Sequence, residues 1–184
     1  MRVVAGSAKG IRLAPVPRGV RPVSDMAREG LFASLGDLVD GARVLDLYAG
    51  TGAMAIEALS RGADRAVLVE RDRAALRTIR DNLGRTRLVQ DAEIMAADVE
   101  RFAAGAGDRG APFDLVVADP PYDTPLDEVE RVLAALAEGW LAGRDWRVVL
   151  TRPTRSSTLV IPVHWAIARR LSYGDTLVLI FREA

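Results

Sequence analysis

Short apolar runs alternate with amphipathic stretches over most of the chain, starting near residue 42. The runs ARVLDLY, RAVLVE, AEIMAAD, FDLVVAD and WRVVLTR are apolar on both faces, which predicts five buried strands. Apolar residues at helical spacing predict helices between them, over 53–61, 73–83, 99–104 and 126–137. Strands that alternate with helices in this way predict a parallel sheet with helices on both faces.

Both ends of the chain depart from this alternation. The C-terminal stretch WAIARRLSYGDTLVLIFRE consists of two β-rich runs around Gly174-Asp175, which predicts an antiparallel hairpin. At the N-terminus, RVVAG and IRLAPV read as short strands, and Ser24 as the N-cap of a helix. We therefore expect a doubly wound α/β domain over residues 39–184 and a small β-hairpin and helix extension over residues 1–38.

The composition limits the kinds of chemistry that the chain can use. It has 184 residues, of which 49% are hydrophobic and 27% charged, as expected for one globular domain. No apolar run approaches the roughly 20 residues of a membrane span, and no apolar segment follows the N-terminal charge, so we expect neither membrane nor signal peptide but a cytoplasmic protein. Cysteine is absent, which excludes disulfides and thiolate metal sites. The single histidine, His164, lies among apolar neighbours and is predicted to be structural, which leaves catalysis to carboxylates and backbone groups, without a metal.

The net charge of zero is unevenly distributed. Residues 1–30 hold two acidic residues against six basic ones, so this segment carries +4 and the rest −4; the basic residues are Arg2, Lys9, Arg12, Arg18, Arg21 and Arg28. A basic N-terminal arm indicates an anionic partner such as nucleic acid, although a merely solvated surface explains six charges equally well.

The first apolar run of the alternation ends in a possible ligand site. Asp46 ends the strand, and Gly50, Thr51 and Gly52 form a tight turn into a helix, where the backbone can approach a ligand closely. The next strand ends in Glu70, a carboxylate that can accept hydrogen bonds from a ribose diol. These features predict a ligand that contains a nucleoside.

The identity of that nucleoside depends on the acids. Gly50, Gly52 and Ala55 fit G-x-G-x-x-A, so a nicotinamide or flavin remains an alternative. Asp46, however, would repel a pyrophosphate and attract a cation, and Asp98 ends the third strand where it could bind an adenine amino group. The acids therefore favour S-adenosylmethionine, although each could instead be a helix N-cap. We assign the adjacent residues to the same pocket: Tyr48, Arg71 and Val99.

The fourth strand ends in ADPPY. Pro120 and Pro121 stiffen the loop and donate no N–H group, so Asp119 and the Pro120 carbonyl could accept both hydrogens of a planar amine. Tyr122 could stack on the ring that carries this amine. The arrangement suits methyl transfer to an exocyclic amine, with Asp119, Pro120, Pro121 and Tyr122 as the catalytic residues.

DLYAGTG followed by ADPPY resembles the class I, seven-stranded, Rossmann-like S-adenosylmethionine-dependent amino-methyltransferases. The N-terminal RVVAGSAKGIRLAPVPRGVRPVSDMAREGLF, together with EALSRGA and YGDT, resembles the bacterial small-subunit rRNA guanine-N2 methyltransferases of the D type nearly end to end. Val23 and Ser24 replace a Thr pair of that pattern, and Met26 stands where an arginine is common, which leaves the role of the N-terminal arm less defined.

The resemblance implies methylation of one guanine N2 in 16S rRNA of the small ribosomal subunit or its assembly intermediate, with S-adenosylhomocysteine as product. It further implies RNA contacts by Arg12, Arg21 and Arg28. A DNA adenine-N6 or protein glutamine methyltransferase would share DPPY, whereas a nicotinamide-dependent oxidoreductase or a non-catalytic RNA-binding module would not need it. We expect a monomer.

Overall fold

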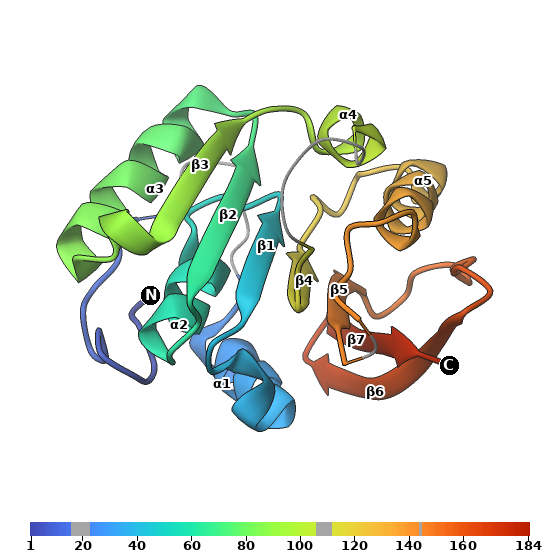
Figure 1. The fold of residues 1–184 in the computed structure, drawn as a ribbon, viewed down its shortest axis with the longest axis horizontal. Coiled ribbons are helices and arrows are strands. Elements are labelled where there is room, and N and C mark those ends of the chain that lie inside the picture. The colour runs from blue at the N-terminus through green and yellow to red at the C-terminus, as the bar shows by residue number, and fades with distance from the viewer. Residues whose placement is uncertain (16–22, 106–111, 144) are drawn as a thin grey trace.

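The computed structural model describes residues 1–15, 23–105, 112–143 and 145–184. Within these ranges, seven strands form one sheet in the order β3-β2-β1-β4-β5-β7-β6 (Figure 1). The strands are β1 (Arg43–Leu47), β2 (Arg65–Glu70), β3 (Ala92–Ala96), β4 (Leu115–Ala118), β5 (Arg147–Pro153), β6 (Trp165–Tyr173) and β7 (Thr176–Glu183). The first five are parallel, and β7 is antiparallel to both β5 and β6, which confirms the predicted doubly wound sheet with an antiparallel edge.

Helices cover both faces of the sheet, as the alternation predicts (Figure 1). On one face lie α1 (Asp25–Leu35), α2 (Ala53–Ser60) and α3 (Arg73–Thr86); on the other lie α4 (Val99–Ala104) and α5 (Leu126–Ala137). Two short 3-10 turns, η1 (Gly36–Val39) and η2 (Val89–Asp91), precede β1 and β3.

Local capping fixes several helix ends. The Ser24 side chain accepts a hydrogen bond from Ala27 N, which confirms it as the N-cap of α1. Both α4 and α5 begin and end at the predicted residues. By contrast, α3 continues past the predicted end, because Gly84 is accommodated within the helix and the chain leaves it only at Arg87, which has a positive φ of 62°.

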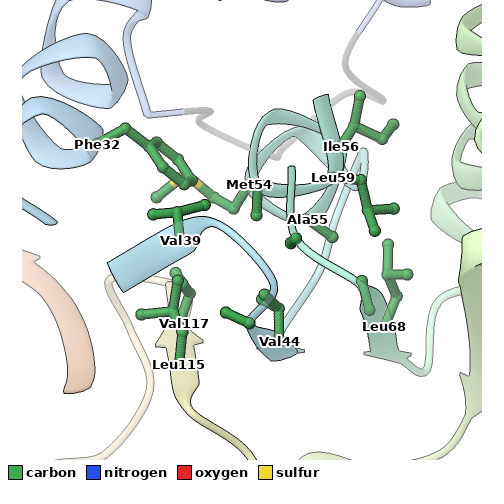
Figure 2. Packing of buried hydrophobic residues seen from close by; sticks show 14 of the residues in the cluster. Phe32, Val39, Val44, Met54, Ala55, Ile56, Leu59, Leu68, Leu115 and Val117 are labelled. Carbon is green, nitrogen blue, oxygen red and sulfur yellow. The ribbon is translucent and has the colours of Figure 1, made fainter. Parts of the chain in front are cut away.

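Alternation of side chains along the strands separates two apolar cores. Val44 of β1 and Val117 of β4 point to the face of α1 and α2, where Phe32 and Met54 pack against them (Figure 2). Side chains one position on in each strand belong to the other core, beneath α4 and α5. Because the period of a strand is two residues, Asp46 lies on the same face as Val44, and Asp119 continues the face of Val117.

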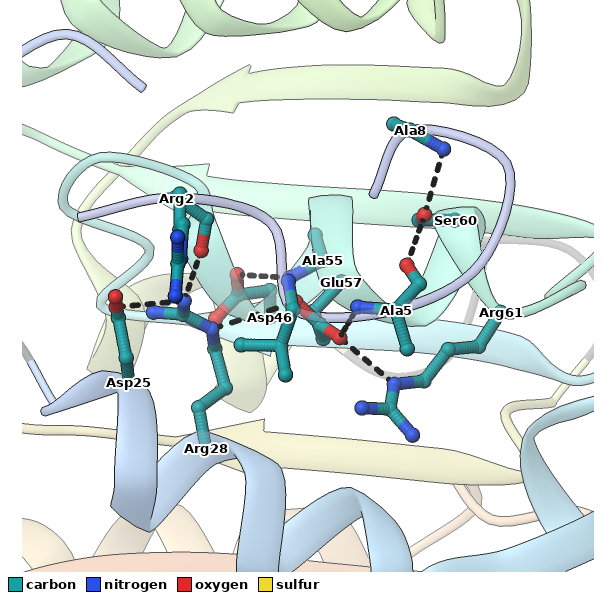
Figure 3. A network of polar contacts seen from close by, with 11 residues as sticks. Arg2, Ala5, Ala8, Asp25, Arg28, Asp46, Ala55, Glu57, Ser60 and Arg61 are labelled. Carbon is teal, nitrogen blue, oxygen red and sulfur yellow. Dashed lines mark hydrogen bonds and ion pairs between the residues drawn. The ribbon is translucent and has the colours of Figure 1, made fainter. Parts of the chain in front are cut away.

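The N-terminal segment forms a short antiparallel hairpin in place of two regular strands. In its described part an antiparallel bridge joins Arg2 and Arg12, and backbone hydrogen bonds run from Val3 N to the Ile11 carbonyl, from Gly10 N to the Val3 carbonyl and from Leu13 N to the Met1 carbonyl. Just after the first arm, a side chain of α2 binds the backbone: Glu57 accepts from Val4 N at 2.8 Å and from Ala5 N at 3.0 Å. The Ser60 hydroxyl likewise accepts from a backbone N–H of this segment (Figure 3).

A buried ion-pair network joins this segment to α1 and α2. The Glu57 side chain is fully buried and lies 2.8 Å from Arg61 Nε and 3.5 Å from Arg28 Nε. Arg28 also donates to the Arg2 carbonyl and to Asp25 (Figure 3). The N-terminal segment is thus held by specific polar contacts as well as by its apolar side chains, which pack in the core of α1 and α2.

None of the helices among the described residues is both long and apolar enough to cross a membrane.

Candidate active site

A pocket of about 820 Å³ opens at the carboxyl ends of the parallel strands. This size is typical of small-molecule sites. The predicted residues that line it are Asp46, Tyr48, Gly50, Thr51, Glu70, Arg71, Asp98, Val99, Asp119, Pro120, Pro121 and Tyr122. The structure therefore brings together all of the predicted cofactor and catalytic residues except Gly52.

The sheet topology explains this convergence. The chain turns outward from β1 to β2 and β3 on one side and continues through β4 and β5 on the other, so β1 and β4 are neighbours at the switch point. The loops that follow these two strands diverge there, which leaves a crevice in which open α/β sheets bind ligands. Asp46, near the end of β1, and Asp119, just after β4, stand on its two sides.

Glycine is required in the turn between β1 and α2. Gly50 and Gly52 have positive φ values of 56° and 75°, which side chains other than glycine rarely adopt. A Cβ at Gly52 would also lie 3.1 Å from Leu68 Cδ2. Gly52 thus faces core side chains such as Leu68, and it does not line the pocket.

Glu70 anchors the same turn. Its carboxylate accepts hydrogen bonds from Gly50 N at 2.9 Å and from Arg71 N and Asp72 N, both at 2.8 Å. A carboxylate offers about four acceptor positions, so at least one is left for a ligand. Glu70 therefore joins the end of β2 to the glycine turn in addition to the ligand contact that we predict for it.

Of the two acids at the switch point, Asp46 is fully buried and Asp119 is partly buried. Asp46 accepts a hydrogen bond from Ala55 N at 3.0 Å, and burial raises its pKa well above the usual value, with Asp119 and Glu70 contributing further. Burial also raises the pKa of Asp119 to about 6, against the effect of a hydrogen bond donated by Thr151 Oγ1. Such clustered carboxylates in a cleft are typical of functional sites and favour a cationic ligand.

The DPPY loop places an aromatic ring at the mouth of the pocket. A turn follows the prolines, with Thr124 N donating to the Pro121 carbonyl at 2.9 Å. Tyr122 is 41% exposed, and its hydroxyl lies 2.9 Å from Thr176 Oγ1 at the start of β7. The ring is therefore accessible, while its hydroxyl is tied to the C-terminal hairpin.

Asp98 and Arg71 have structural roles as well as positions in the pocket wall. Asp98 accepts from Arg101 N as the N-cap of α4, and its other oxygen lies 3.0 Å from Arg71 Nη1. The alternative role predicted for Asp98, that of a helix N-cap, is thus present in the structure. Since Asp98 is partly exposed, it still faces the pocket.

Three further polar residues of the site were not predicted from the sequence: Glu128, Thr151 and Thr176. Tyr48 Oη lies 3.5 Å from Glu128 Oε1 on α5, and burial together with this carboxylate raises the pKa of Tyr48. Thr151 contacts Asp119, and Thr176 contacts Tyr122. The sequence does contain a signal for Thr176, since it belongs to the YGDT stretch, but Glu128 and Thr151 stand in ordinary helix and strand patterns.

The three predicted RNA-contacting arginines have different outcomes. Arg12 is exposed, and Arg21 lies outside the described residues. For Arg28 the prediction was wrong: its side chain is 1% exposed and is bound to Asp25 and Glu57. Arg28 also borders the pocket, but because its guanidinium is nearly fully buried in this network, it supports the N-terminal segment rather than presenting charge to RNA.

Outside the pocket, His164 is exposed in the loop before β6, so it is not a core histidine. Among the described residues, no group of three acidic or histidine side chains is placed to hold a metal ion.

Comparison with known proteins gives consistent matches over the whole chain. A family model described as conserved hypothetical protein 95 matches residues 1–182. The chain is 33% identical to "Putative rRNA methyltransferase YlbH" of Bacillus subtilis, covering 100% of this chain and 99% of that protein. It is also 33% identical to "Ribosomal RNA small subunit methyltransferase D" of Escherichia coli strain K12, covering 100% and 91%. The solved structure "Putative methyltransferase yhhF from Escherichia coli" superposes with a TM-score of 0.86 at 31% identity, covering 100% and 97%.

Proposed function

The chain belongs to the family described as conserved hypothetical protein 95, and from this premise we propose that it methylates the exocyclic N2 of one guanine in 16S rRNA of the small ribosomal subunit. The names of the relatives support rRNA methylation, and the motif resemblance supports guanine N2. The observation that carries the proposal is the pairing of a partly buried acceptor, Asp119, with the accessible ring of Tyr122 at the mouth of an acid-lined pocket.

The pocket suits S-adenosylmethionine as the methyl donor. It has room for the molecule, and a cationic group of the donor would stabilise the charged form of Asp46, which burial disfavours. Glu70 retains acceptor capacity for a ribose, and Asp98 borders the same pocket for a base. The remaining residues of the cofactor pocket are proposed to be Tyr48, Gly50, Thr51, Gly52, Arg71 and Val99. The donor supplies a methyl group activated by a positively charged sulfur, and S-adenosylhomocysteine is the product.

The DPPY residues would bind and orient the guanine. The Asp119 carboxylate and the Pro120 carbonyl accept the two hydrogens of the amine, and Tyr122 stacks on the base. Hydrogen bonding to a carboxylate increases the electron density on nitrogen, and the fixed geometry aligns its lone pair for attack. When the new N–C bond forms and the S–C bond of the donor breaks, the nitrogen gives up one proton, which Asp119 would accept.

RNA binding is proposed to use the exposed basic residues of the N-terminal segment. In residues 1–15, Arg2, Lys9 and Arg12 are all exposed. So few positive charges on a neutral chain would give a modest affinity that falls with salt. We therefore propose that the protein acts as a monomer on a structured substrate, the small subunit or its assembly intermediate.

The proposal is tested by methyl transfer from labelled S-adenosylmethionine to small subunits from cells that lack the enzyme. Wild type is expected to label 16S rRNA and to yield N2-methylguanine by nucleoside mass spectrometry. Asp119→Ala should lose at least about 100-fold in kcat, because it removes the group that accepts the proton. Asp145→Ala, which changes an exposed acid away from the pocket, should be unaffected.

Two results would contradict the proposal. One is N6-methyladenine or a methylated protein as the product, which would show that the chain has another amino-methyltransferase activity. The other is full activity of Asp119→Ala, with folding verified by thermal unfolding. Stabilisation of the protein by NAD but not by S-adenosylhomocysteine would refute the choice of donor.

A further inference from the structure

We propose that Thr151 is a positioning residue for the methyl transfer: its hydroxyl binds one oxygen of Asp119, so that the other oxygen is the one that accepts from the substrate amine. This inference rests on the proposed function only in that Asp119 contacts the substrate. No motif pointed to Thr151; its assignment comes from the structure alone.

Strand register brings the two side chains together. In the parallel pair of β4 and β5, Ala118 is opposite Leu150, so the next residues, Asp119 and Thr151, also lie side by side. Both continue the face of Val117 and Val149, which belong to the core under α1 and α2. The contact is thus set by two adjacent backbone segments rather than by flexible loops.

The hydrogen bond has a defined direction. Thr151 Oγ1 donates to Asp119 Oδ1, and the Thr151 side chain is fully buried. Among the described residues, Thr151 is the hydrogen-bond donor recorded for this carboxylate. A buried carboxylate oxygen without a donor is unfavourable, so Oδ1 stays with Thr151 and the plane of the carboxylate is fixed. Oδ2 is then available to the pocket.

The same hydroxyl controls the charge of Asp119. Burial raises the pKa of Asp119 to about 6, and the Thr151 hydrogen bond opposes this rise. The charged or titratable groups that share the pocket with Asp119 are Asp46 on β1 and Tyr48 just after it, Glu70 at the end of β2 with Arg71 and Asp72 after it, Asp98 before α4, Arg28 on α1, Glu128 on α5, and Tyr122 and Asp123 on the same loop. Burial disfavours the negative charge of Asp119, and the hydrogen bond from Thr151 is the opposing contribution. Thr151 therefore helps to keep Asp119 ionised, as a group that accepts a proton must be.

The sign of the pH effect follows directly. Donation to a carboxylate stabilises its charged form, so Thr151→Val should raise the pKa of Asp119 above its wild-type value of about 6. A hydrogen bond to a charged group corresponds to a shift of about one pH unit. The acidic limb of the rate profile should move upward by that amount.

The first experiment follows the Asp119 carboxyl carbon by NMR in protein labelled with ¹³C-aspartate, using Asp119→Asn to assign the signal. We compare wild type, Thr151→Val and Thr151→Ser without any substrate. The midpoint should rise in the valine variant and return toward the wild-type value in serine, which keeps the hydroxyl. An unchanged midpoint in the valine variant would overturn the inference, whatever the substrate of the enzyme.

The second experiment measures kcat/KM for rRNA methylation between pH 5.5 and 9. Thr151→Val should lose about tenfold at pH 5.5 and less at pH 8 and above, and Thr151→Ser should recover most of the loss. A loss that is equal at all pH values would indicate a purely structural role and refute the inference. Thermal unfolding checks that the nearly isosteric variants are folded. If the NMR midpoint shifts but no variant, including wild type, methylates rRNA, the proposed function fails and the Asp119–Thr151 coupling stands.

Discussion

Replacing Glu57 by glutamine is expected to lower the free energy of unfolding by about 3–5 kcal/mol. Glu57 is fully buried between Arg28 and Arg61, and it also accepts from the backbone N–H groups of Val4 and Ala5. The substitution keeps the shape of the side chain but removes its charge and replaces one acceptor oxygen with a donor NH2 group. That NH2 group would then face the N–H donors that now surround the carboxylate.

The magnitude follows from burial. Removing one partner of a buried ion pair leaves the other charge in a site of low dielectric constant, which costs several kcal/mol. A loss of 3–5 kcal/mol is a large part of the roughly 5–15 kcal/mol by which a typical domain is stable. For a chain of this length it corresponds to a fall of about 6–20 °C in Tm.

The assay is equilibrium unfolding in urea, followed by the fluorescence of the buried tryptophans Trp140, Trp146 and Trp165. Asp81→Asn is the matched control, because the ion pair of Asp81 and Arg85 has the same i, i+4 spacing as that of Glu57 and Arg61 but is about half exposed. It should cost less than about 0.5 kcal/mol. Equal losses in the two variants would refute the assignment of Glu57 as the centre of the buried network.

Two further comparisons test packing and the aromatic clamp. Gly30→Ala should destabilise the protein by about 1–3 kcal/mol in thermal unfolding, because its Cβ would lie 1.9 Å from Tyr173 Oη, and Tyr173→Phe should restore part of this. The control Gly84→Ala, with open space around its Cβ, should instead stabilise α3 by about 0.5–1 kcal/mol; the opposite ranking would contradict the packing described. Tyr122→Ala should reduce kcat/KM for rRNA roughly 5- to 150-fold through lost stacking, whereas Tyr122→Phe, which keeps the ring and loses the hydroxyl contact with Thr176, should stay close to wild type. Equal losses in both would show that the hydroxyl rather than the ring is needed.

The sequence predicts the sheet and helices well because their signals are local. Strands that are apolar on both faces, such as RAVLVE, can be stable only inside a covered sheet, and β2 is found there. N-caps at Ser24, Asp72 and Asp98 act within three residues of themselves. For the same reason α4 and α5 could be predicted with correct ends.

The N-terminal segment was predicted less well because distant residues determine its structure. Val4 and Ala5 look like parts of a strand, but their N–H groups bind a carboxylate more than 50 positions away. Arg28 looks like one of several surface arginines, and only the packing of α1 against α2 reveals that Glu57 is its buried partner. The residues next to a charged residue in the sequence do not indicate whether its side chain is buried.

The candidate site, too, has features that the sequence predicts and features that only the folded structure reveals. The sequence by itself determined that Asp46, Glu70 and Asp119 meet, because the carboxyl ends of parallel strands lie along one edge of the sheet. Only the tertiary structure decided which oxygen of each acid is occupied and which groups fix it. Thr151 is 32 residues from Asp119, and Thr176 is 54 residues from Tyr122. Hydrogen bonds depend on distances of a few tenths of an ångström between side chains from different strands, and no pattern along a single chain encodes those distances.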